Sequence, residues 1–168
     1  METKLEHILT HSYKEGMIAF METHPEAFEE AIQLAVSDKQ PYSWRASWLL
    51  WSVMKDNDLR VQGSVSKIID ILPTLRDGQQ RELFKILYKM ELDEEYEGHI
   101  FSLCVDVWEK IHKQPSVRWN AIQLILKISK KHPDLLHEIL LLTQEQYMET
   151  LSPGVRYSIS KLIGSSIK

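Results

Sequence analysis

The stretch PSVRWNAIQLILKI, residues 115–128, predicts a buried helix and decides the fold. A proline opens it, at the position where a helix loses no hydrogen bond, and apolar residues then recur every three or four positions. These residues are Val117, Ala121, Leu124 and Ile128. Such a stripe covers one side of a helix, so we expect the segment to pack against other helices.

The same pattern recurs along the chain, aligned each time on an arginine. The four segments are YSWRASWLLWS, GQQRELFKILY, PSVRWNAIQLI and PGVRYSISKLI, and their arginines are Arg45, Arg81, Arg118 and Arg156. The arginines are 36, 37 and 38 residues apart, and a second helical run fills each interval. A period of this length with two helices is typical of helical-repeat solenoids.

Two-residue alternation is nowhere sustained in the rest of the chain, which also has helical periodicity. We therefore predict an all-α fold, a short right-handed α-α superhelix of about four helical hairpins with about nine helices. It forms a single domain of residues 1–168, with N-terminal capping helices in residues 1–24. The four repeats are expected at about 25–57, 58–92, 93–131 and 132–168.

Prolines and short polar side chains mark the expected helix ends. Proline costs little in the first turn of a helix, and the prolines that precede apolar runs are Pro25, Pro115, Pro133 and Pro153. The side chains expected to cap helices are Ser43, Asp58, Asp77 and Ser152. Gly63 and Gly98 follow their arginines at similar distances, which indicates either close approach of neighbouring helices or coincidence.

The stretch PYSWRASWLLWSV, residues 41–53, places Trp44, Trp48 and Trp51 on about one face of a helix. When the two segments are aligned on their arginines, the positions equivalent to these tryptophans hold aliphatic residues in the segment at 115–128. We therefore predict that the three tryptophans are oversized core residues rather than an aromatic binding strip.

The pattern Val-Arg-x-x-Ala-x-x-Leu after a proline-containing turn resembles the second helix of a HEAT repeat, and residues 115–128 match it best. The segment SPGVRYSISKLI also matches, with Ile159 in the alanine position. This resemblance implies an armadillo-type (HEAT/ARM-like) solenoid whose second helices line a concave face. The family usually has an aspartate six residues before the arginine, but this chain has Lys39, Leu75, His112 and Thr150 there. The arginines therefore either pair otherwise or face solvent.

Over its full length the chain also resembles a group of short bacterial helical-repeat proteins, chiefly through SDKQPYSWRASWLL, residues 37–50. Some of those proteins bear the enzyme name adenylosuccinate lyase. The Ser-rich loop of that lyase family, S-S-x-M-P-x-K-x-N, is absent here, and its catalytic histidine–serine arrangement cannot be placed on this sequence. The residues therefore do not support lyase activity.

The overall charge and the cysteine count restrict the class of protein. Against 20 lysines and arginines stand 24 acidic residues, a net charge of −4 that argues against a broadly basic nucleic-acid surface. Cys104 is the single cysteine, which fits a reducing compartment. The N-terminus lacks the pattern of a signal peptide, and the longest apolar run is only ILLL, residues 139–142. We expect a cytoplasmic protein without membrane contact.

Neither catalytic motifs nor cofactor motifs are recognised in the sequence, so we predict that the protein is not an enzyme and needs no cofactor. His7 and His11 are four residues apart and could hold a metal from one helix face, but no third ligand is evident, so no metal site is predicted. The acidic cluster at residues 91–97 is expected at a helix start, where carboxylates complement the helix dipole. Cys104 lies in an apolar run and is expected to be a packed thiol.

The arginine column is the strongest candidate for function. One arginine near the start of each second helix would form a row on the concave face, with aromatic and basic neighbours. The candidate binding residues are Arg45, Arg81, Lys85, Arg118, Trp119, Arg156, Tyr157 and Lys161. Because arginine and aromatic residues are common in protein-binding hot spots, we predict a non-catalytic scaffold or adaptor that binds another protein. In the other interpretation, the arginines satisfy carbonyls and carboxylates between repeats.

An alternative function is nucleic-acid binding, in a protein related to the HEAT-like alkylpurine DNA glycosylases. Those enzymes carry tryptophans and arginines on a concave face, and such side chains also bind nucleic-acid backbones and bases. They are longer and more basic than this chain, and their catalytic aspartate cannot be placed here. The sequence leaves the oligomeric state open.

Overall fold

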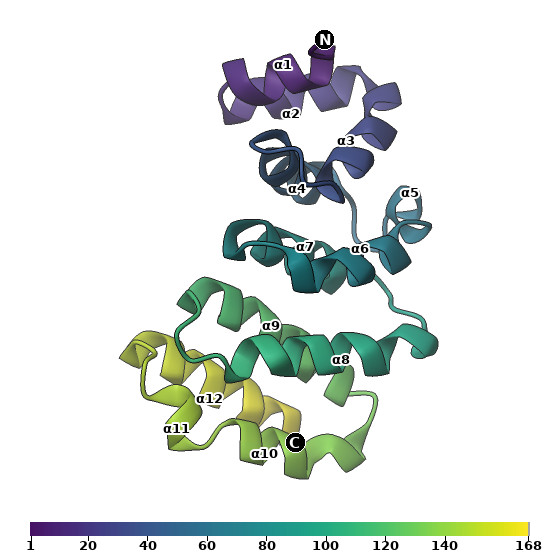
Figure 1. The fold of residues 1–168 in the computed structure, drawn as a ribbon. Helices are drawn as coiled ribbons and strands as arrows, with labels where there is room; N and C mark the ends of the chain where they lie inside the picture. Colours follow the sequence, from purple (N-terminus) through teal and green to yellow (C-terminus); the bar gives the residue numbers. More distant parts are fainter. Residues whose placement is uncertain (168) are drawn as a thin grey trace. The chain divides into compact units, whose positions relative to one another are not determined.

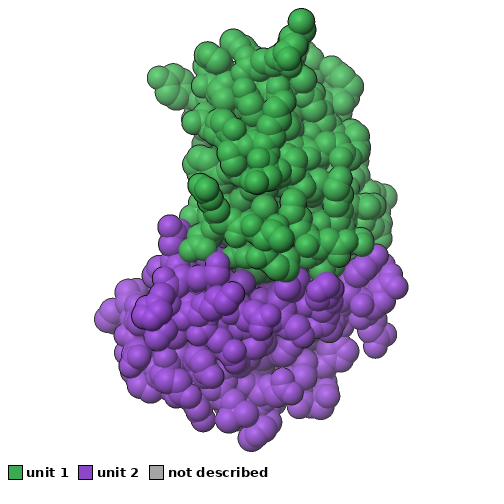
Figure 2. All heavy atoms as spheres, viewed as in Figure 1, with its two compact units in different colours: residues 1–92 green, residues 93–168 purple. Residues whose placement is uncertain are grey.

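The computed structural model describes residues 1–167, and in that range every regular element is helical (Figure 1). The predicted all-α class is confirmed. The described chain has twelve α-helices and three short 3-10 helices instead of about nine helices, because two of the expected runs are interrupted. Two compact units divide the chain, residues 1–92 and the unit that begins at Asp93 (Figure 2).

The first unit is organised around α4. Its elements are α1 (Lys4–His11), α2 (Lys14–Thr23), η1 (Pro25–Ala27), α3 (Phe28–Ala35), α4 (Tyr42–Val53), α5 (Leu59–Gln62), α6 (Val65–Ile71), η2 (Leu72–Thr74) and α7 (Asp77–Lys89). Helix α4 packs against α3 and α7, and also against α1 and α2 (Figure 1).

Small residues let α3 and α7 pack closely on α4. The buried residues of α4 are Ser43, Ala46, Ser47, Leu49 and Leu50. Their hydroxyl groups are satisfied locally, since Ser47 donates a hydrogen bond to the Ser43 carbonyl at 2.8 Å. Buried polar groups need such partners, so the two serines can lie in the core beside the large apolar side chains of Leu49 and Leu50.

The tryptophans of α4 lie on another side of the helix. Trp44 is 41% exposed, and Trp48 and Trp51 are half-buried. The prediction that they are oversized core residues is therefore wrong. The alignment on the arginines did not match the buried positions, because α4 buries a different side from the one that the segment at 115–128 buries.

The expected caps have mixed outcomes. Asp58 caps α5 as predicted, since its carboxylate accepts a hydrogen bond from the backbone N–H of Arg60. The Arg60 guanidinium also donates to this carboxylate and lowers the pKa of Asp58 to about 2. Ser43 instead lies buried inside α4, and Asp77 follows the N-cap position rather than occupying it, so these two predictions are wrong.

The second unit contains a long hairpin and a shorter set of helices. Its elements are α8 (Glu94–Glu109), α9 (Pro115–Ser129), η3 (Pro133–Leu135), α10 (Leu136–Leu142), α11 (Glu145–Met148) and α12 (Pro153–Ile167). Helix α8 packs along α9, and α12 also contacts α9. The stripe predicted for the segment at 115–128 is buried as expected, with Val117, Ala121 and Leu124 each 0% exposed.

Helix starts in both units confirm the proline prediction. Pro115 and Pro153 begin α9 and α12, while Pro25 and Pro133 begin the 3-10 turns that precede α3 and α10. Ser152 caps α12 as expected, because its hydroxyl accepts a hydrogen bond from the Val155 N–H at 3.3 Å.

The two aligned glycines do not mark close helix contacts. Gly63 ends α5 and separates it from α6, while Gly98 lies within α8. A Cβ added at either glycine would meet open space in the described part of the chain. The interpretation that neighbouring helices approach closely there is therefore wrong.

Candidate protein-interaction surface

Helix α4 displays its tryptophans beside basic side chains of α2 and α7. We call this surface of the first unit the tryptophan face; it consists of Lys14, Trp44, Arg45, Trp48, Trp51 and Lys85. Lys85 Nζ lies 4.1 Å from the centroid of the Trp51 ring, and Lys89 Nζ lies 4.8 Å from it. Lys14 Nζ lies 5.8 Å from the Trp48 centroid. Cations over indole rings are attracted by the ring quadrupole, which holds half-buried tryptophans in place.

A hollow of about 270 Å³ opens on the tryptophan face. Its lining residues are Lys14, Met17, Trp44, Arg45 and Trp48. Three of the five are apolar or aromatic, and the other two are cations. Such a hollow suits an apolar side chain whose own neighbours carry negative charge.

Gly78 allows Trp44 to lie against the start of α7. A Cβ at position 78 would sit 3.3 Å from the indole Nε1 of Trp44, which is tighter than an ordinary contact. The glycine therefore leaves the room that this indole ring occupies.

Arg45 connects the tryptophan face to the capping helices. It is half-buried, and its Nη1 donates a hydrogen bond to the Leu9 carbonyl at 2.8 Å. Leu9 lies in the last turn of α1, where carbonyl groups lack partners within the helix. Arg45 thus satisfies a backbone carbonyl and also lines the hollow.

Arg81 and Lys85 are brought together by a buried carboxylate. Glu82 is 2% exposed; its Oε1 accepts from Arg81 Nε at 3.2 Å and its Oε2 from Lys85 Nζ at 3.3 Å. Lys85 is therefore held between Glu82 and the Trp51 ring. Glu82 was not identified from the sequence, although a carboxylate among the buried residues of α7 indicates a buried ion pair.

Arg118, in contrast, lies in the interior of the second unit. It is 0% exposed, and its Nε donates to the Trp108 carbonyl at 2.9 Å. Its Nη atoms donate to Thr150 Oγ1 at 3.2 Å and to the Tyr147 carbonyl. The guanidinium also lies 4.4 Å from the centroid of the Trp108 ring, and burial lowers the pKa of Arg118. Its contacts therefore connect α8, α9 and the segment around α11.

The other predicted residues of the second unit lie on α9 and α12. Trp119 lines a hollow of about 340 Å³ between these helices. Arg156 Nη2 lies 2.7 and 2.6 Å from the two carboxylate oxygens of Glu145. Tyr157 is 70% exposed and Lys161 is also exposed. The structure thus gives the four aligned arginines four different environments.

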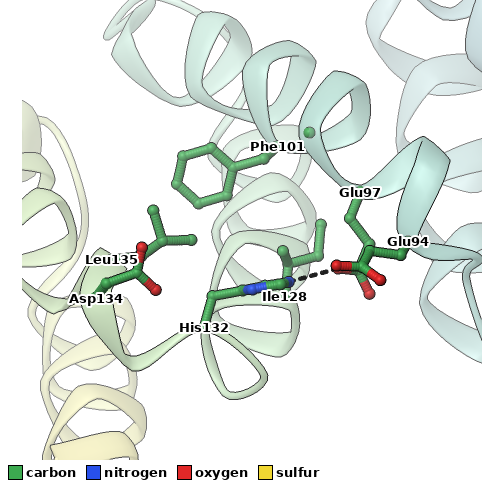
Figure 3. Close-up of a pocket in the computed structure, with 8 residues that line it drawn as sticks. Glu94, Glu97, Phe101, Ile128, His132, Asp134 and Leu135 are labelled. Carbon is green, nitrogen blue, oxygen red and sulfur yellow. Dashed lines mark hydrogen bonds and ion pairs between the residues drawn. The ribbon is translucent and has the colours of Figure 1, made fainter.

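A third hollow, of about 310 Å³, lies where α8 meets α9 and η3 (Figure 3). Its lining residues are Glu94, Glu97, Gly98, Phe101, Ile128, His132, Asp134 and Leu135. Glu97 is 4% exposed; its Oε1 accepts from Lys131 Nζ at 2.9 Å, and its Oε2 lies 2.6 Å from His132 Nε2. The hydrogen bond from Lys131 lowers the pKa of Glu97 the most, and the hydrogen bond from His132 lowers it further. The carboxylates and the apolar wall together suit a cationic side chain.

Sequence reasoning missed this hollow in part. The acidic cluster at residues 91–97 does begin a helix, as expected, because Glu94, Glu95 and Glu97 lie in the first turn of α8. Glu97, however, continues the buried stripe of Ile100 and Cys104, and a carboxylate on such a stripe signals a buried partner. His132, thirty-five residues later, carries no comparable signal.

Two further expectations concern Cys104 and the membrane. Cys104 is fully buried, as predicted for a packed thiol, and burial raises its pKa so that it stays protonated at neutral pH. Among the helices of residues 1–167, none is long and apolar enough to cross a membrane.

Comparison with known families agrees with this architecture. A family model described as the HEAT repeat domain matches residues 1–165. No curated protein sequence and no solved structure matches the chain significantly. The match extends from α1 into α12 and therefore covers the helices of both units. The chain belongs to the HEAT repeat domain family.

Proposed function

We propose that the protein is a non-catalytic scaffold that binds another protein through the tryptophan face. The observation that carries this proposal is the position of the exposed Trp44 and the half-buried Trp48 beside a cation-lined hollow. Tryptophan and arginine are enriched where alanine substitution costs protein complexes the most affinity. The ring of Trp51 already has the ammonium groups of Lys85 and Lys89 over it, so the contact is expected to centre on Trp44 and Trp48.

The chemistry of the face indicates the kind of partner. The hollow offers apolar walls from Met17 and the two indole rings, with Lys14 and Arg45 beside them. A complementary segment therefore carries an apolar or aromatic side chain flanked by carboxylates. Because the chain has a net charge of −4, this cationic face stands out from the average surface charge.

The scaffold is proposed to consist of the capping residues 1–24 and repeats near 25–57, 58–92, 93–131 and 132–168. The junction between the two compact units, after Leu92, coincides with one of these repeat boundaries, which supports the division. Stacked repeats suit a scaffold because each one adds rigid surface without needing catalytic groups.

The proposal is tested by affinity capture with a matched pair of variants. The intact chain, a Trp44→Ala/Trp48→Ala variant and a Trp119→Ala control are immobilised and exposed to an extract of the native host. Quantitative mass spectrometry then compares the proteins that each of them retains. We expect the chain and the Trp119→Ala control to retain a common protein that the double variant retains about 30-fold less. Retention that does not depend on Trp44 and Trp48 would contradict the proposal. Circular dichroism verifies that the double variant keeps its helix content.

Fluorescence anisotropy with labelled duplex and single-stranded DNA at low salt separates the protein-binding function from nucleic-acid binding. A protein scaffold is expected to leave the anisotropy unchanged at tens of micromolar protein, where even non-specific DNA binders give a signal. DNA binding that is lost in a Lys14→Ala/Arg45→Ala variant would favour the nucleic-acid function instead.

A further inference from the structure

Helix α1 carries two histidines whose imidazole rings are aligned. His7 and His11 are four residues apart, and their rings stack with centroids 4.1 Å apart and an angle of 14° between planes. Four residues are about one helical turn, so both rings project from the same side of α1. Two imidazoles in this arrangement are a common half of a transition-metal site.

The structure adds a third ligand that the sequence did not reveal. Glu2 precedes the N-cap residue Thr3, whose extended backbone lets the chain fold back toward α1. Glu2 Oε2 lies 3.3 Å from His7 Nδ1. One possible ligand atom from each of Glu2, His7 and His11 lies within 4.8 Å of the other two.

Contacts outside the cluster orient two of these side chains. Tyr42, from α4, donates a hydrogen bond from its hydroxyl to Glu2 Oε1 at 3.0 Å. His11 Nδ1 lies 3.1 Å from the His7 carbonyl oxygen, and a hydrogen bond there leaves the lone pair on Nε2. Metal-binding histidines and carboxylates usually have such supporting partners, which fix the ring orientation and the tautomer.

From this arrangement we infer that Glu2, His7 and His11 form a Zn²⁺ site at the N-terminal end of the first unit. Zn²⁺ binds imidazole nitrogen and carboxylate oxygen at about 2.0–2.2 Å, which places tetrahedral ligand atoms about 3.3 Å apart. The three side chains are exposed, so rotation about their side-chain bonds can close the remaining distance without moving the helix. Imidazole ligands favour Zn²⁺ over Mg²⁺ or Ca²⁺.

A metal bound by these residues would tie the start of the chain to the last turn of α1. Through Tyr42 it would also link α1 to α4, the helix that carries the tryptophan face. Three protein ligands leave a fourth position for water or for a side chain of a partner. The site is thus a metal clamp between the start of the chain and α1, and it does not depend on the proposed function of the tryptophan face.

Isothermal titration of the untagged full chain with ZnCl₂ tests the site, with MgCl₂ as the control ion. We expect one Zn²⁺ per chain with a dissociation constant on the order of micromolar, and a higher melting temperature when Zn²⁺ is present. A His7→Ala/His11→Ala variant is expected to lose binding at least about 100-fold, and Tyr42→Phe to lose about tenfold. A His137→Ala variant, which removes an exposed histidine of α10, is expected to bind as the unmodified chain does.

The result that overturns the inference is equally specific. Binding that is absent from the unmodified chain, or that persists in His7→Ala/His11→Ala, excludes the site. Binding that is unchanged in Glu2→Gln excludes the three-ligand arrangement. Since all three ligands are exposed, the variants are expected to fold, and circular dichroism without metal verifies this.

Discussion

Two tryptophan–arginine pairs in this molecule have opposite environments. In the second unit, Trp108 and Arg118 are both 0% exposed, and the arginine donates to backbone carbonyls around the indole ring. In the first unit, Trp44 is 41% exposed and its neighbour Arg45 lines an open hollow. The same residue types therefore provide core in one unit and accessible surface in the other. The neighbouring residues decide between these outcomes, since α4 buries serine, alanine and leucine side chains instead of its indoles.

The largest difference in the free energy of unfolding is expected between alanine variants of the two tryptophans. Trp108→Ala removes a fully buried indole whose Nε1 donates to the Leu142 carbonyl at 2.7 Å, so we expect a loss of about 3–5 kcal/mol in the free energy of unfolding. Trp44→Ala is expected to cost about 1 kcal/mol or less, because its ring is already partly in water. Urea denaturation followed by circular dichroism measures both. Equal losses would mean that the two indoles do not differ in burial.

The arginines are expected to differ next most strongly. Arg118→Ala leaves the carbonyls of Trp108 and Tyr147 without their buried donor, which should cost about 2–4 kcal/mol. Arg45→Ala removes one hydrogen bond at a half-buried position and should cost about 1 kcal/mol. The same denaturation experiment distinguishes them, and an Arg118→Ala variant as stable as Arg45→Ala would contradict the structural role.

Much of the helical architecture could be predicted from the sequence, because it depends on local signals. The apolar stripe of the segment at 115–128 and the prolines at helix starts predicted α9, α12 and their neighbours. The sequence did not predict the interruption at Gly63, where the first helix of the second repeat divides into α5 and α6. A break of one or two residues hardly changes the periodicity of a stripe, so the number of helices came out too low.

The sites were harder to predict because they depend on which side of each helix is buried. Alignment of the repeats equated the columns of α4 with those of α9, but Ser43 and Ala46 form the packed side of α4. The partners in the other clusters are distant in sequence, as Glu97 and His132 are, and only the packing of α8 on α9 brings them together.

A third, smaller contrast is expected between the ion pairs of a buried glutamate and of an exposed glutamate. Glu97→Gln removes a buried carboxylate bonded to Lys131 and His132 and should cost about 1–2 kcal/mol at pH 7. Glu145→Gln, its control, removes an exposed partner of Arg156 and should cost less than about 0.5 kcal/mol. Thermal melts of both variants provide the measurement.

The effect of Glu97 should also depend on pH. Its pKa is lower in the folded than in the unfolded chain, so its ionised form stabilises the fold above the unfolded value of about 4.3. This stabilisation is lost as the pH falls through the folded pKa, and the difference between Glu97→Gln and the unmodified chain should shrink there. A difference that grew toward acidic pH would contradict the assignment.

The smallest expected effect concerns Gly78 beneath Trp44. Gly78→Ala places a Cβ 3.3 Å from the indole Nε1, so the exposed ring should shift while the free energy of unfolding changes by about 0.5 kcal/mol or less. Fluorine NMR of chain containing 5-fluorotryptophan detects the shift at one of the five indoles, identified with a Trp44→Phe variant. A Trp108 signal that moved instead would place the strain elsewhere.

Hydroxyl-radical footprinting with mass spectrometry tests the central claim most directly, namely that the tryptophans of α4 are a recognition surface. In the free chain we predict fast oxidation of the exposed Trp44, slower oxidation of the half-buried Trp48 and protection of the buried Trp108. When the captured partner protein is added, oxidation of Trp44 and Trp48 should fall while that of Trp119 stays unchanged. Protection of Trp44 and Trp48 in the free chain, or equal oxidation of both with and without the partner, would contradict the account.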